Sequence, residues 1–400
     1  MLVQFNFKNF LSFKEETTLD MTAINAYKEH RYNLIDIGEK EKYIKVAAIY
    51  GANASGKSNL FYALHYFQNI VRESFNNSDQ DDQTVIQRCY NPFMFDKEIN
   101  NTEFEIIELF DGSEYKYGFE YNNKEIVAEW LYKKDLLTKR KTIYIERENS
   151  NISMGASIRK ECSVYKDQIP KETLALSFFN KLKLETDIFN SIYNEIMATL
   201  VIPSDLCENK DIIVRMLPGT IDKHKDKLLN FLNAIDTGIK DIYYETEPQR
   251  SEPLFFTTHI DQDGNEYPLG LFFESEGTIK SINTFIYVQN AIQYGKSLFI
   301  DELNVKLHPL LVKFIIDLFY EENSTAQLIY TTHDTTLLDK KFFRRDQIWF
   351  VQKDKYGHSE LTALSDFKVR SDASFEKDYL AGVYGGIPDI NKDYSLKDGE

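Results

Sequence analysis

The chain has few of the residues that mark disulfide-rich, zinc-binding and membrane proteins. Its 400 residues include only three cysteines, Cys89, Cys162 and Cys207, which lie far apart and form no CxxC pair. They predict neither a disulfide framework nor a zinc site, and they are typical of a reducing compartment. No stretch approaches the roughly 18 uncharged apolar residues of a membrane span, and the N-terminus MLVQFNFKNF does not resemble a signal peptide. We therefore expect a cytoplasmic protein without membrane contact.

Positive charge is scarce as well. The sequence has 47 Lys and Arg residues against 63 Asp and Glu residues, which gives a formal net charge of −16. Nucleic-acid binding needs a clustered positive face, so the surface as a whole is not expected to bind nucleic acid. The densest basic cluster consists of Lys133, Lys134, Lys139, Arg140 and Lys141. We interpret this cluster as a solvated strand end or loop, and a local nucleic-acid contact is the alternative.

The composition is that of a globular protein, and it is rich in aromatic residues. It is 42% hydrophobic and 28% charged, with 29 Phe and 25 Tyr residues. A chain of this length can bury a large core, and we expect that core to be divided between two lobes.

One segment carries specific chemistry. Residues 51–58 read GANASGKS, which is a full match to the phosphate-binding pattern GxxxxGK[ST]. The preceding residues 46–50 form an apolar run of strand type, and residues 58–67 have the apolar spacing of a helix. A glycine-rich loop between a strand and a helix N-terminus is the arrangement that cradles nucleotide phosphates. The sequence therefore predicts a site for a nucleoside triphosphate.

The residues of this phosphate loop have different predicted roles. Gly51 and Gly56 allow the backbone to curl, so that its N–H groups point at phosphate oxygens. Lys57 would reach the β- and γ-phosphates, and the Ser58 hydroxyl would ligate Mg²⁺. The other predicted nucleotide contacts of this segment are Asn53, Ala54, Ser55 and Asn59. No motif reads the base, so these residues do not distinguish ATP from GTP.

A second group of candidate residues follows two apolar strands. The run at 298–300 ends in Asp301 and Glu302. Asp301 is placed to hold Mg²⁺ through a water, and Glu302 can polarise an attacking water as general base. The run at 328–330 leads to His333, which could donate a hydrogen bond to the γ-phosphate from a neighbouring strand end. Taken alone, a histidine in this position is more often structural.

The segment Ser275-Glu276-Gly277-Thr278 precedes a helical run. Ser275, Gly277 and the helix N-terminus would form a second anion-binding end. By itself, this segment is better interpreted as an ordinary helix cap.

Strand and hairpin patterns dominate the first part of the chain. Apolar and polar residues alternate at 2–7, and a second short run at 17–21 predicts a strand pair before the phosphate loop. Strand patterns recur from 93 to 147, and Asp111-Gly112 lies between two of them as a hairpin signal. We therefore expect an antiparallel β subdomain in this region.

Helical patterns follow. Residues 170–240 repeat apolar residues at three- and four-residue intervals and are expected to be helical. Helices and apolar strands alternate from 285 to 352, which is typical of an α/β fold with a parallel sheet. Residues 76–83 predict an acidic loop, and the polar residues from 389 onward predict a frayed end.

We divide the chain into four parts on these patterns. Residues 1–75 would be the N-terminal lobe with the phosphate loop, and residues 76–150 the antiparallel β subdomain. Residues 151–245 would be a helical insertion, and residues 246–400 the C-terminal lobe with the remaining candidate site residues.

In chain order, the phosphate loop, the S-x-G-T segment, the strand ending in Asp-Glu and the strand-end histidine form a known set. The chain resembles the ABC-type ATPases, which include structural-maintenance-of-chromosomes, RecF and overcoming-lysogenization-defect ATPases. The resemblance implies an α/β ATPase head with an antiparallel β subdomain and an inserted helical subdomain. It also implies that two heads sandwich ATP, with Ser275 and Gly277 acting on the γ-phosphate bound by the partner copy.

A narrower resemblance covers most of the chain. It rests on the segments Asn9-Phe10-Leu11-Ser12-Phe13, 51–59, Asp301-Glu302-Leu303 with Leu307-His308-Pro309, Asp346-Gln347-Ile348-Trp349-Phe350 and Tyr384-Gly385-Gly386-Ile387-Pro388. These are similar to the bacterial AAA_15/AAA_21 ATPases, including the AbiL and RloA abortive-infection type and the ATPase subunit of the PARIS anti-phage system. The resemblance implies an ATP- and Mg²⁺-dependent switch in phage defence, with a separately encoded nuclease or TOPRIM-like effector and a phage-derived trigger.

The chain also departs from these families, and other functions stay open. Asn304 stands where the family often has Asp, and no glutamine can be assigned to the loop that senses Mg²⁺ in ABC heads. The main alternative is a RecF- or SMC-like DNA-repair or chromosome ATPase with DNA as its ligand. Further alternatives are a transporter ATPase subunit and a binding protein without catalysis. The intact Lys57, Asp301, Glu302 and His333 argue against the last of these.

Overall fold

The structure is a computed structural model of the full chain. It describes residues 1–37, 41–75, 83–96, 100–203, 210–235, 237–321, 324–370 and 373–388. The predicted acidic loop lies outside the described residues except for its last residue, and so do the predicted frayed end and Cys207. Cys89 and Cys162 are buried and are not joined to each other.

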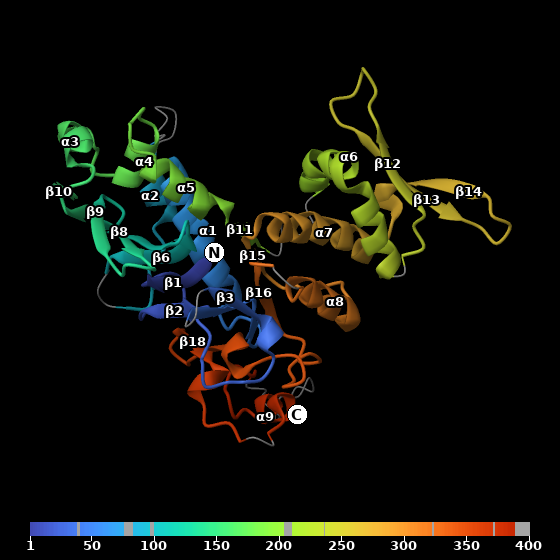
Figure 1. The fold of residues 1–400 in the computed structure, drawn as a ribbon. Helices are drawn as coiled ribbons and strands as arrows, with labels where there is room; N and C mark the ends of the chain where they lie inside the picture. The colour runs from blue at the N-terminus through green and yellow to red at the C-terminus, as the bar shows by residue number, and fades with distance from the viewer. Residues whose placement is uncertain are drawn as a thin grey trace, which may run out of the picture.

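A six-stranded sheet lies at the centre of the molecule, with the strand order β11-β15-β16-β5-β17-β18 (Figure 1). Its strands are β5 (Val46–Tyr50), β11 (Leu200–Ile202), β15 (Ser297–Ile300), β16 (Gln327–Thr332), β17 (Ile348–Lys353) and β18 (Ser359–Ala363). All neighbours are parallel except β17 and β18. The expected α/β fold with a parallel sheet is thus confirmed. The short strand β11 lies within the segment predicted to be helical, because three apolar residues are too few to show a strand period.

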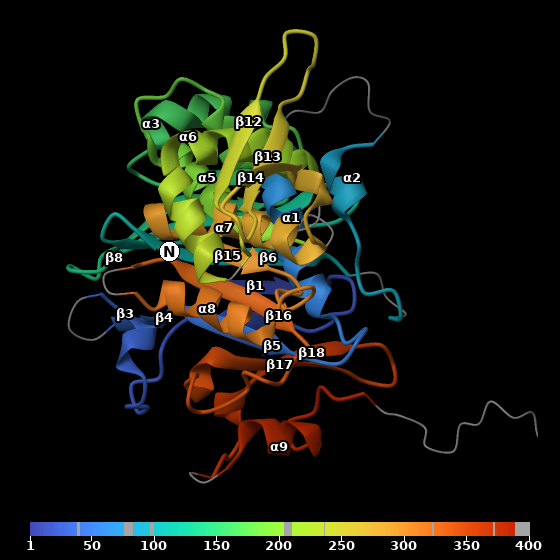
Figure 2. The ribbon, with the colours of Figure 1, turned by 90° about the vertical axis from the view of Figure 1, so that its right-hand side faces the viewer.

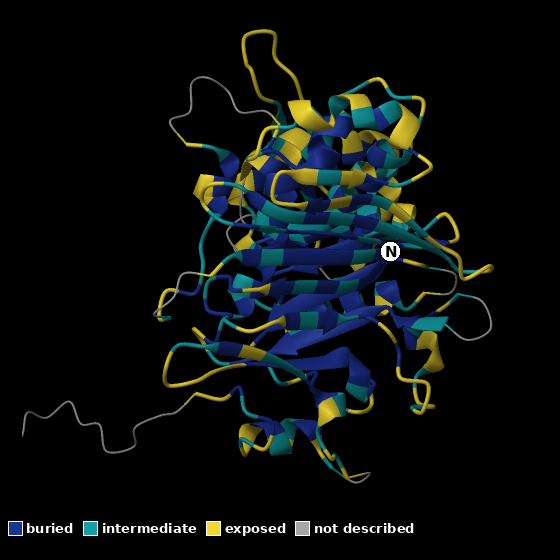
Figure 3. Ribbon diagram, turned by 90° about the vertical axis from the view of Figure 1, so that its left-hand side faces the viewer, coloured by how far each residue is buried: buried dark blue, intermediate teal, exposed yellow. Residues whose placement is uncertain are grey.

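An antiparallel sheet of seven strands packs beside the central sheet, in the order β10-β9-β8-β7-β6-β1-β2. Its strands are β1 (Leu2–Lys8), β2 (Thr17–Asp20), β6 (Thr102–Phe110), β7 (Ser113–Tyr121), β8 (Ile126–Asp135), β9 (Lys141–Glu148) and β10 (Asn151–Met154). The predicted hairpin turn is present, and Asp111 and Gly112 have φ values of 47° and 64°, as a type I′ turn requires. Figure 3 shows buried and partly exposed residues alternating along these strands. The predicted strand pair at the N-terminus joins this same sheet.

Helix α1 (Lys57–Glu73) lies between the two sheets, whereas α7 (Glu276–Tyr294) and α8 (Pro309–Phe319) cover the other face of the central sheet (Figure 1). The side chains of β5 show this division. Ala47 and Ile49 belong to the core that contains α1, and Val46, Ala48 and Tyr50 belong to the core that contains α7 and α8. Alternate residues of a strand point to opposite faces, so α1 and α7 are separated by the sheet.

Smaller elements surround this framework. A kinked helix and a three-stranded sheet project beyond α7 (Figures 1 and 2); they are α6 (Lys210–Ala234), β12 (Asp241–Glu245), β13 (Leu254–Ile260) and β14 (Glu266–Gly270). The remaining elements are β3 (Leu34–Ile37), β4 (Glu41–Ile44), α2 (Val85–Cys89), α3 (Arg159–Cys162), α4 (Ala175–Asn180), α5 (Ile188–Ala198) and α9 (Phe375–Leu380). Helices therefore form much of the segment 170–240, as predicted.

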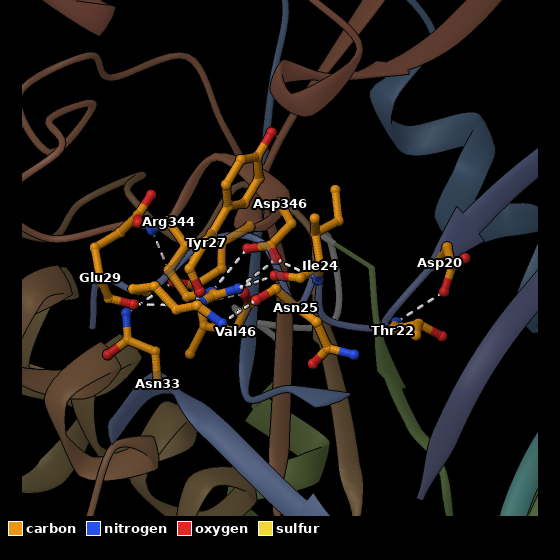
Figure 4. Close-up of polar contacts among 12 residues, drawn as sticks. Asp20, Thr22, Ile24, Asn25, Tyr27, Glu29, Asn33, Val46, Arg344 and Asp346 are labelled. Carbon is orange, nitrogen blue, oxygen red and sulfur yellow. Dashed lines mark hydrogen bonds and ion pairs between the residues drawn. The ribbon is translucent and has the colours of Figure 1, made fainter. Parts of the chain in front are cut away.

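The segment that contains Asp346-Gln347 has a structural role (Figure 4). Arg344 is fully buried and forms an ion pair of 2.7 Å with Asp346. Its guanidinium also donates hydrogen bonds to the backbone carbonyls of Ile24, Tyr27 and Glu29. The guanidinium thus ties the segment before β3 to the start of β17, the strand that pairs with β5.

Replacing Arg344 by methionine is expected to destabilise the protein by about 3–5 kcal/mol, because it leaves the Asp346 carboxylate buried without its counter-charge. Urea-induced unfolding measures this loss. The matched control is Lys341→Met, which removes the same charge from an exposed position nearby. Equal midpoints for the two variants would show that the buried pair does not hold this region together.

Candidate functional site

The phosphate loop lies between β5 and α1, at the carboxyl end of the central sheet. A Cβ atom on Gly51 would lie only 2.6 Å from the Val351 carbonyl oxygen and 2.7 Å from the Ser55 hydroxyl. Gly56 has a φ of 111°, which disfavours side chains at this position. The two glycines are thus required by the shape of the loop, as the pattern predicted.

Lys57 begins α1 and is buried. Its ammonium donates hydrogen bonds to the carbonyl oxygens of Gly51 and Ala52, at 2.9 and 3.0 Å. Burial lowers the pKa of Lys57, and the carboxylates of Asp301 and Glu302 act in the opposite direction. The fold therefore brings the charge of Lys57 into the field of the two acidic residues that the sequence placed in the same site.

The loop is also suited to hold an anion. The Ser55 hydroxyl is buried and has no hydrogen-bond partner within the described part of the chain. Gly56 occupies the N-cap of α1, where it offers no side-chain acceptor to the first turn of the helix. Uncapped N–H groups at a helix N-terminus form an anion site, so the loop fits a phosphate group.

The side chains of Ser12, Asn59 and Ser359 form a hydrogen-bonded cluster that supports the phosphate loop. The Ser359 hydroxyl donates to the Ser55 carbonyl oxygen at 2.6 Å, and its oxygen lies within hydrogen-bond distance of the Ser12 hydroxyl, at 2.8 Å. The Asn59 amide, which the sequence placed among the nucleotide contacts, donates to the Ser12 hydroxyl at 2.7 Å. Asn53 and Ala54 are exposed at the loop tip, and Ala54 has a φ of 60°. The side chain of Asn59 thus contacts Ser12, one of the residues that support the loop.

The carboxylates follow β15, two strands away from β5. Asp301 is buried and accepts a hydrogen bond of 2.5 Å from the Thr331 hydroxyl. That hydroxyl also accepts from the backbone N–H of Glu302 at 2.7 Å, and Glu302 has a φ of 51°. Thr331 therefore fixes both the side chain of Asp301 and the backbone of Glu302, a role that the sequence alone did not assign.

His333 follows β16, the strand between β5 and β15. Its ring Nε2 lies 3.4 Å from the amide nitrogen of Asn304. Because parallel strands end at the same edge of a sheet, His333 lies between the phosphate loop and the carboxylates. The fold brings His333 and Asn304 together, so the residue that departs from the family pattern lies next to the candidate γ-phosphate sensor.

Ser275 and Gly277 lie at the start of α7, where a Cβ on Gly277 would lie 3.0 Å from the Lys306 carbonyl oxygen in the loop after β15. Ser275 is the N-cap of α7, where its hydroxyl accepts from the Thr278 N–H at 3.1 Å. Since α7 lies on the opposite face of the sheet from α1, these residues do not share the phosphate loop of their own chain. Lys280 of α7 nevertheless donates to the backbone carbonyl of Glu302 at 3.1 Å, which connects the start of this helix to the acidic loop.

A family model described as "AAA domain, putative AbiEii toxin, Type IV TA system" matches residues 46–339, which include every candidate residue above. The chain belongs to the AAA_21 family. It is therefore an ATPase. The phosphate loop, the carboxylates of Asp301 and Glu302, and His333 lie at the carboxyl edge of the central sheet, within the matched residues. No curated protein matches the chain.

Solved structures similar to this AAA_21 ATPase include two heads of structural-maintenance-of-chromosomes proteins. One is a crystal structure of the SmcHead bound to the C-winged helix domain of ScpA. It is 13% identical in sequence, the match covers 95% of this chain and 99% of that chain, and the TM-score is 0.44. The other is the SMC head domain from Thermotoga maritima, with 14% identity, 90% and 98% coverage and a TM-score of 0.41. Both scores are below 0.5, so function is inferred from the family and the site.

The residues of the AAA_21 ATPase fit Mg²⁺ in the manner of other phosphate-loop proteins. Ser58 offers a hydroxyl at the start of α1, and Asp301 offers one buried carboxylate. No group of three or more His, Cys, Asp or Glu side chains could hold a metal among the described residues. Mg²⁺ usually needs only one or two carboxylates when nucleotide phosphates supply further oxygens. Such a pair therefore fits Mg²⁺ that enters with ATP.

Gly386 of the AAA_21 ATPase packs against the start of the phosphate loop. A Cβ on Gly386 would lie 3.7 Å from the Cα of Gly51 and 3.4 Å from the Val351 carbonyl oxygen. The Thr335 hydroxyl, two residues beyond His333, donates to Glu376 of α9 at 3.1 Å. The only sequence signal for the contact of Gly386 with the phosphate loop was the resemblance of the segment 384–388 to the family.

Within the described residues, no helix has the length and apolar character needed to cross a membrane.

Proposed function

We propose that this ATPase is a nucleotide-driven switch in which two copies share each bound ATP. The observation that carries the proposal is the position of Ser275 on the opposite face of the central sheet from the phosphate loop. Ser275 and Gly277 still form a helix N-terminus suited to an anion. A second copy that faces the first would place this helix end against the γ-phosphate, so that each site is complete only in a dimer or larger assembly.

The residues of one copy would perform the chemistry in the following way. The backbone of the phosphate loop and Lys57 bind the phosphates. Mg²⁺, held by Ser58 and Asp301, would neutralise phosphate charge. Glu302 accepts a proton from the attacking water, and His333 donates a hydrogen bond to the γ-phosphate. Thr331 orients the two acidic residues before ATP arrives.

We place this switch in bacterial phage defence, in the cytoplasm, where it would control a separate effector. The support is the description of the family, which names a toxin of type IV toxin–antitoxin systems. A nuclease or TOPRIM-like effector would be held or released according to the nucleotide state. A phage-derived trigger would change that state.

Direct binding of DNA as the main function is less well supported. In the basic cluster, Lys134 is paired with Glu114 and Lys139 with Glu41, so part of its charge is already balanced. A shift of double-stranded DNA at physiological salt would favour the RecF- or SMC-like alternative.

Ser275→Arg tests the shared site. The variant is expected to bind ATP with unchanged affinity, because its own phosphate loop is intact. It should stay monomeric with a non-hydrolysable ATP analogue and Mg²⁺, since the arginine would clash at the partner's phosphate. Light scattering measures the mass, and Ser153→Arg, at an exposed serine of β10, is the control. A wild-type chain that binds ATP but remains a monomer would overturn the proposal.

A further inference from the structure

Two exposed aromatic rings flank the two halves of the proposed shared site. Phe273 immediately precedes Glu274-Ser275 and is 83% exposed. Its neighbour Phe272 is also exposed, and the Lys210 ammonium lies 4.8 Å from the centre of the Phe272 ring. Contiguous exposed apolar patches are typical of interaction surfaces, and Phe272 and Phe273 are adjacent in the chain.

The second ring lies against the turn before β18, whose first residue, Ser359, supports the phosphate loop. Met94 and Phe95 are 78% and 76% exposed. Phe95 contacts Gly357, since a Cβ on that glycine would lie 2.8 Å from the Phe95 ring. Gly357 is two residues before Ser359, whose hydroxyl donates to the Ser55 carbonyl of the phosphate loop. Phe95 is thus attached to the strand end that supports the phosphate loop.

Each ring is held in place although it is exposed. A Cβ on Gly270 would lie 3.1 Å from the Phe273 ring, and Phe95 makes an edge contact with Phe93 at 5.7 Å between ring centres. In the single copy both rings remain largely in water, so a partner that covers them removes this apolar area from water, which is favourable. Aromatic and methionine side chains are enriched at protein interfaces.

We propose that Phe273 of one copy docks on Met94 and Phe95 of a second copy, beside the shared ATP. This inference rests on the proposed function and names the contacts that hold the dimer. In a two-fold dimer the contact occurs twice, because each copy carries both patches. ATP would then bring the two surfaces together, and the rings would exclude water from the edge of the site.

The apolar area suits a dimer that depends on nucleotide. A buried aromatic side chain covers roughly 150–250 Å², so the four rings of two copies would contribute about 600–1,000 Å². A stable interface buries about 1,200–2,000 Å² in total. The rings alone are therefore insufficient, and the segments around ATP must supply the remaining area. We therefore expect the dimer to form only when nucleotide is bound.

The test uses the full chain carrying Glu302→Gln, which keeps ATP bound. Adding Phe273→Asp or Phe95→Asp is expected to weaken the ATP-dependent dimer at least tenfold in sedimentation or light scattering, with unchanged binding of ATP to the monomer. Leu137→Asp is the control, because Leu137 is 93% exposed at the turn between β8 and β9. A dimer that tolerates both aspartates would overturn the docking contact and leave the shared site intact. A Glu302→Gln chain that stays monomeric with ATP would overturn both.

Cross-linking provides a second readout that does not depend on dimer strength. In a Cys207→Ser background, a Phe273→Cys chain mixed with a Phe95→Cys chain should form a covalent dimer with a short bis-maleimide only when ATP is present. Neither chain alone should do so, because the proposed contact pairs residue 273 of one copy with residue 95 of the other. Burial raises the pKa of Cys89 to about 12 and that of Cys162 to about 11, so these thiols should not react. An ATP-dependent dimer without the mixed cross-link would contradict the proposed contact.

Discussion

Replacing Lys57 by alanine is expected to weaken ATP binding at least about 100-fold, or roughly 2.7 kcal/mol. Lys57 is the cation of the phosphate loop, and its ammonium already lies over the loop, bound to the carbonyls of Gly51 and Ala52. ATP phosphates would replace these carbonyls as acceptors, and hydrogen bonds to charged groups are stronger than neutral ones. Titration calorimetry with Mg-ATP measures the loss.

Loss of binding must be separated from loss of folding, since Lys57 is buried. Its burial lowers its pKa, which means that the charged form is less favourable in the folded chain than in water. Lys57→Met keeps the apolar stem and removes this charge, so we expect its unfolding midpoint without nucleotide to be equal to that of wild type or higher. Lys8→Ala, at an exposed position of β1, is the control for charge. Normal ATP affinity in folded Lys57→Met would refute the assigned role.

Glu302→Gln is expected to retain ATP binding and to reduce hydrolysis at least about 100-fold, which is the lower end of the usual contribution of a general base. Glutamine keeps the shape of the side chain but cannot accept the proton of the attacking water. The backbone of residue 302 should not move, because the Thr331 hydroxyl binds its N–H and Lys280 binds its carbonyl. Single-turnover release of phosphate measures the effect on chemistry.

The retained nucleotide should hold the assembly closed, so the same variant is expected to accumulate as a dimer or larger species with ATP. Glu360→Gln on β18 is the matched control, because this glutamate is exposed and lies on a strand at the edge of the sheet. Hydrolysis at the wild-type rate in Glu302→Gln would mean that another group, such as His333, activates the water.

The phosphate loop was predictable because the residues of its pattern are eight consecutive positions of the chain. The strand, the glycines and the helix that follow one another along the chain are also neighbours in space. The same holds for the Asp111-Gly112 hairpin, where two residues with positive φ determine the turn. Such local patterns need no knowledge of the rest of the fold, and the structure shows each of these elements where it was expected.

The sequence did not indicate which distant residues support the site. Ser12 and Ser359 meet under the phosphate loop although they are 347 residues apart. The strand β11 was not predicted, because its three residues form a strand only through their pairing with β15. The role of Thr331 was also missed, since an ordinary strand-end threonine has no pattern of its own.

The sequence by itself therefore determined the chemistry: a loop that binds phosphate, acidic residues at a strand end, and membership of an ATPase class. Only the tertiary structure decided the geometry. It placed α1 and α7 on opposite faces of one sheet, and it left Phe95 and Phe273 exposed. The physical reason is that local backbone preferences act over a few residues, whereas the side of a sheet that a helix covers depends on how the whole core is packed.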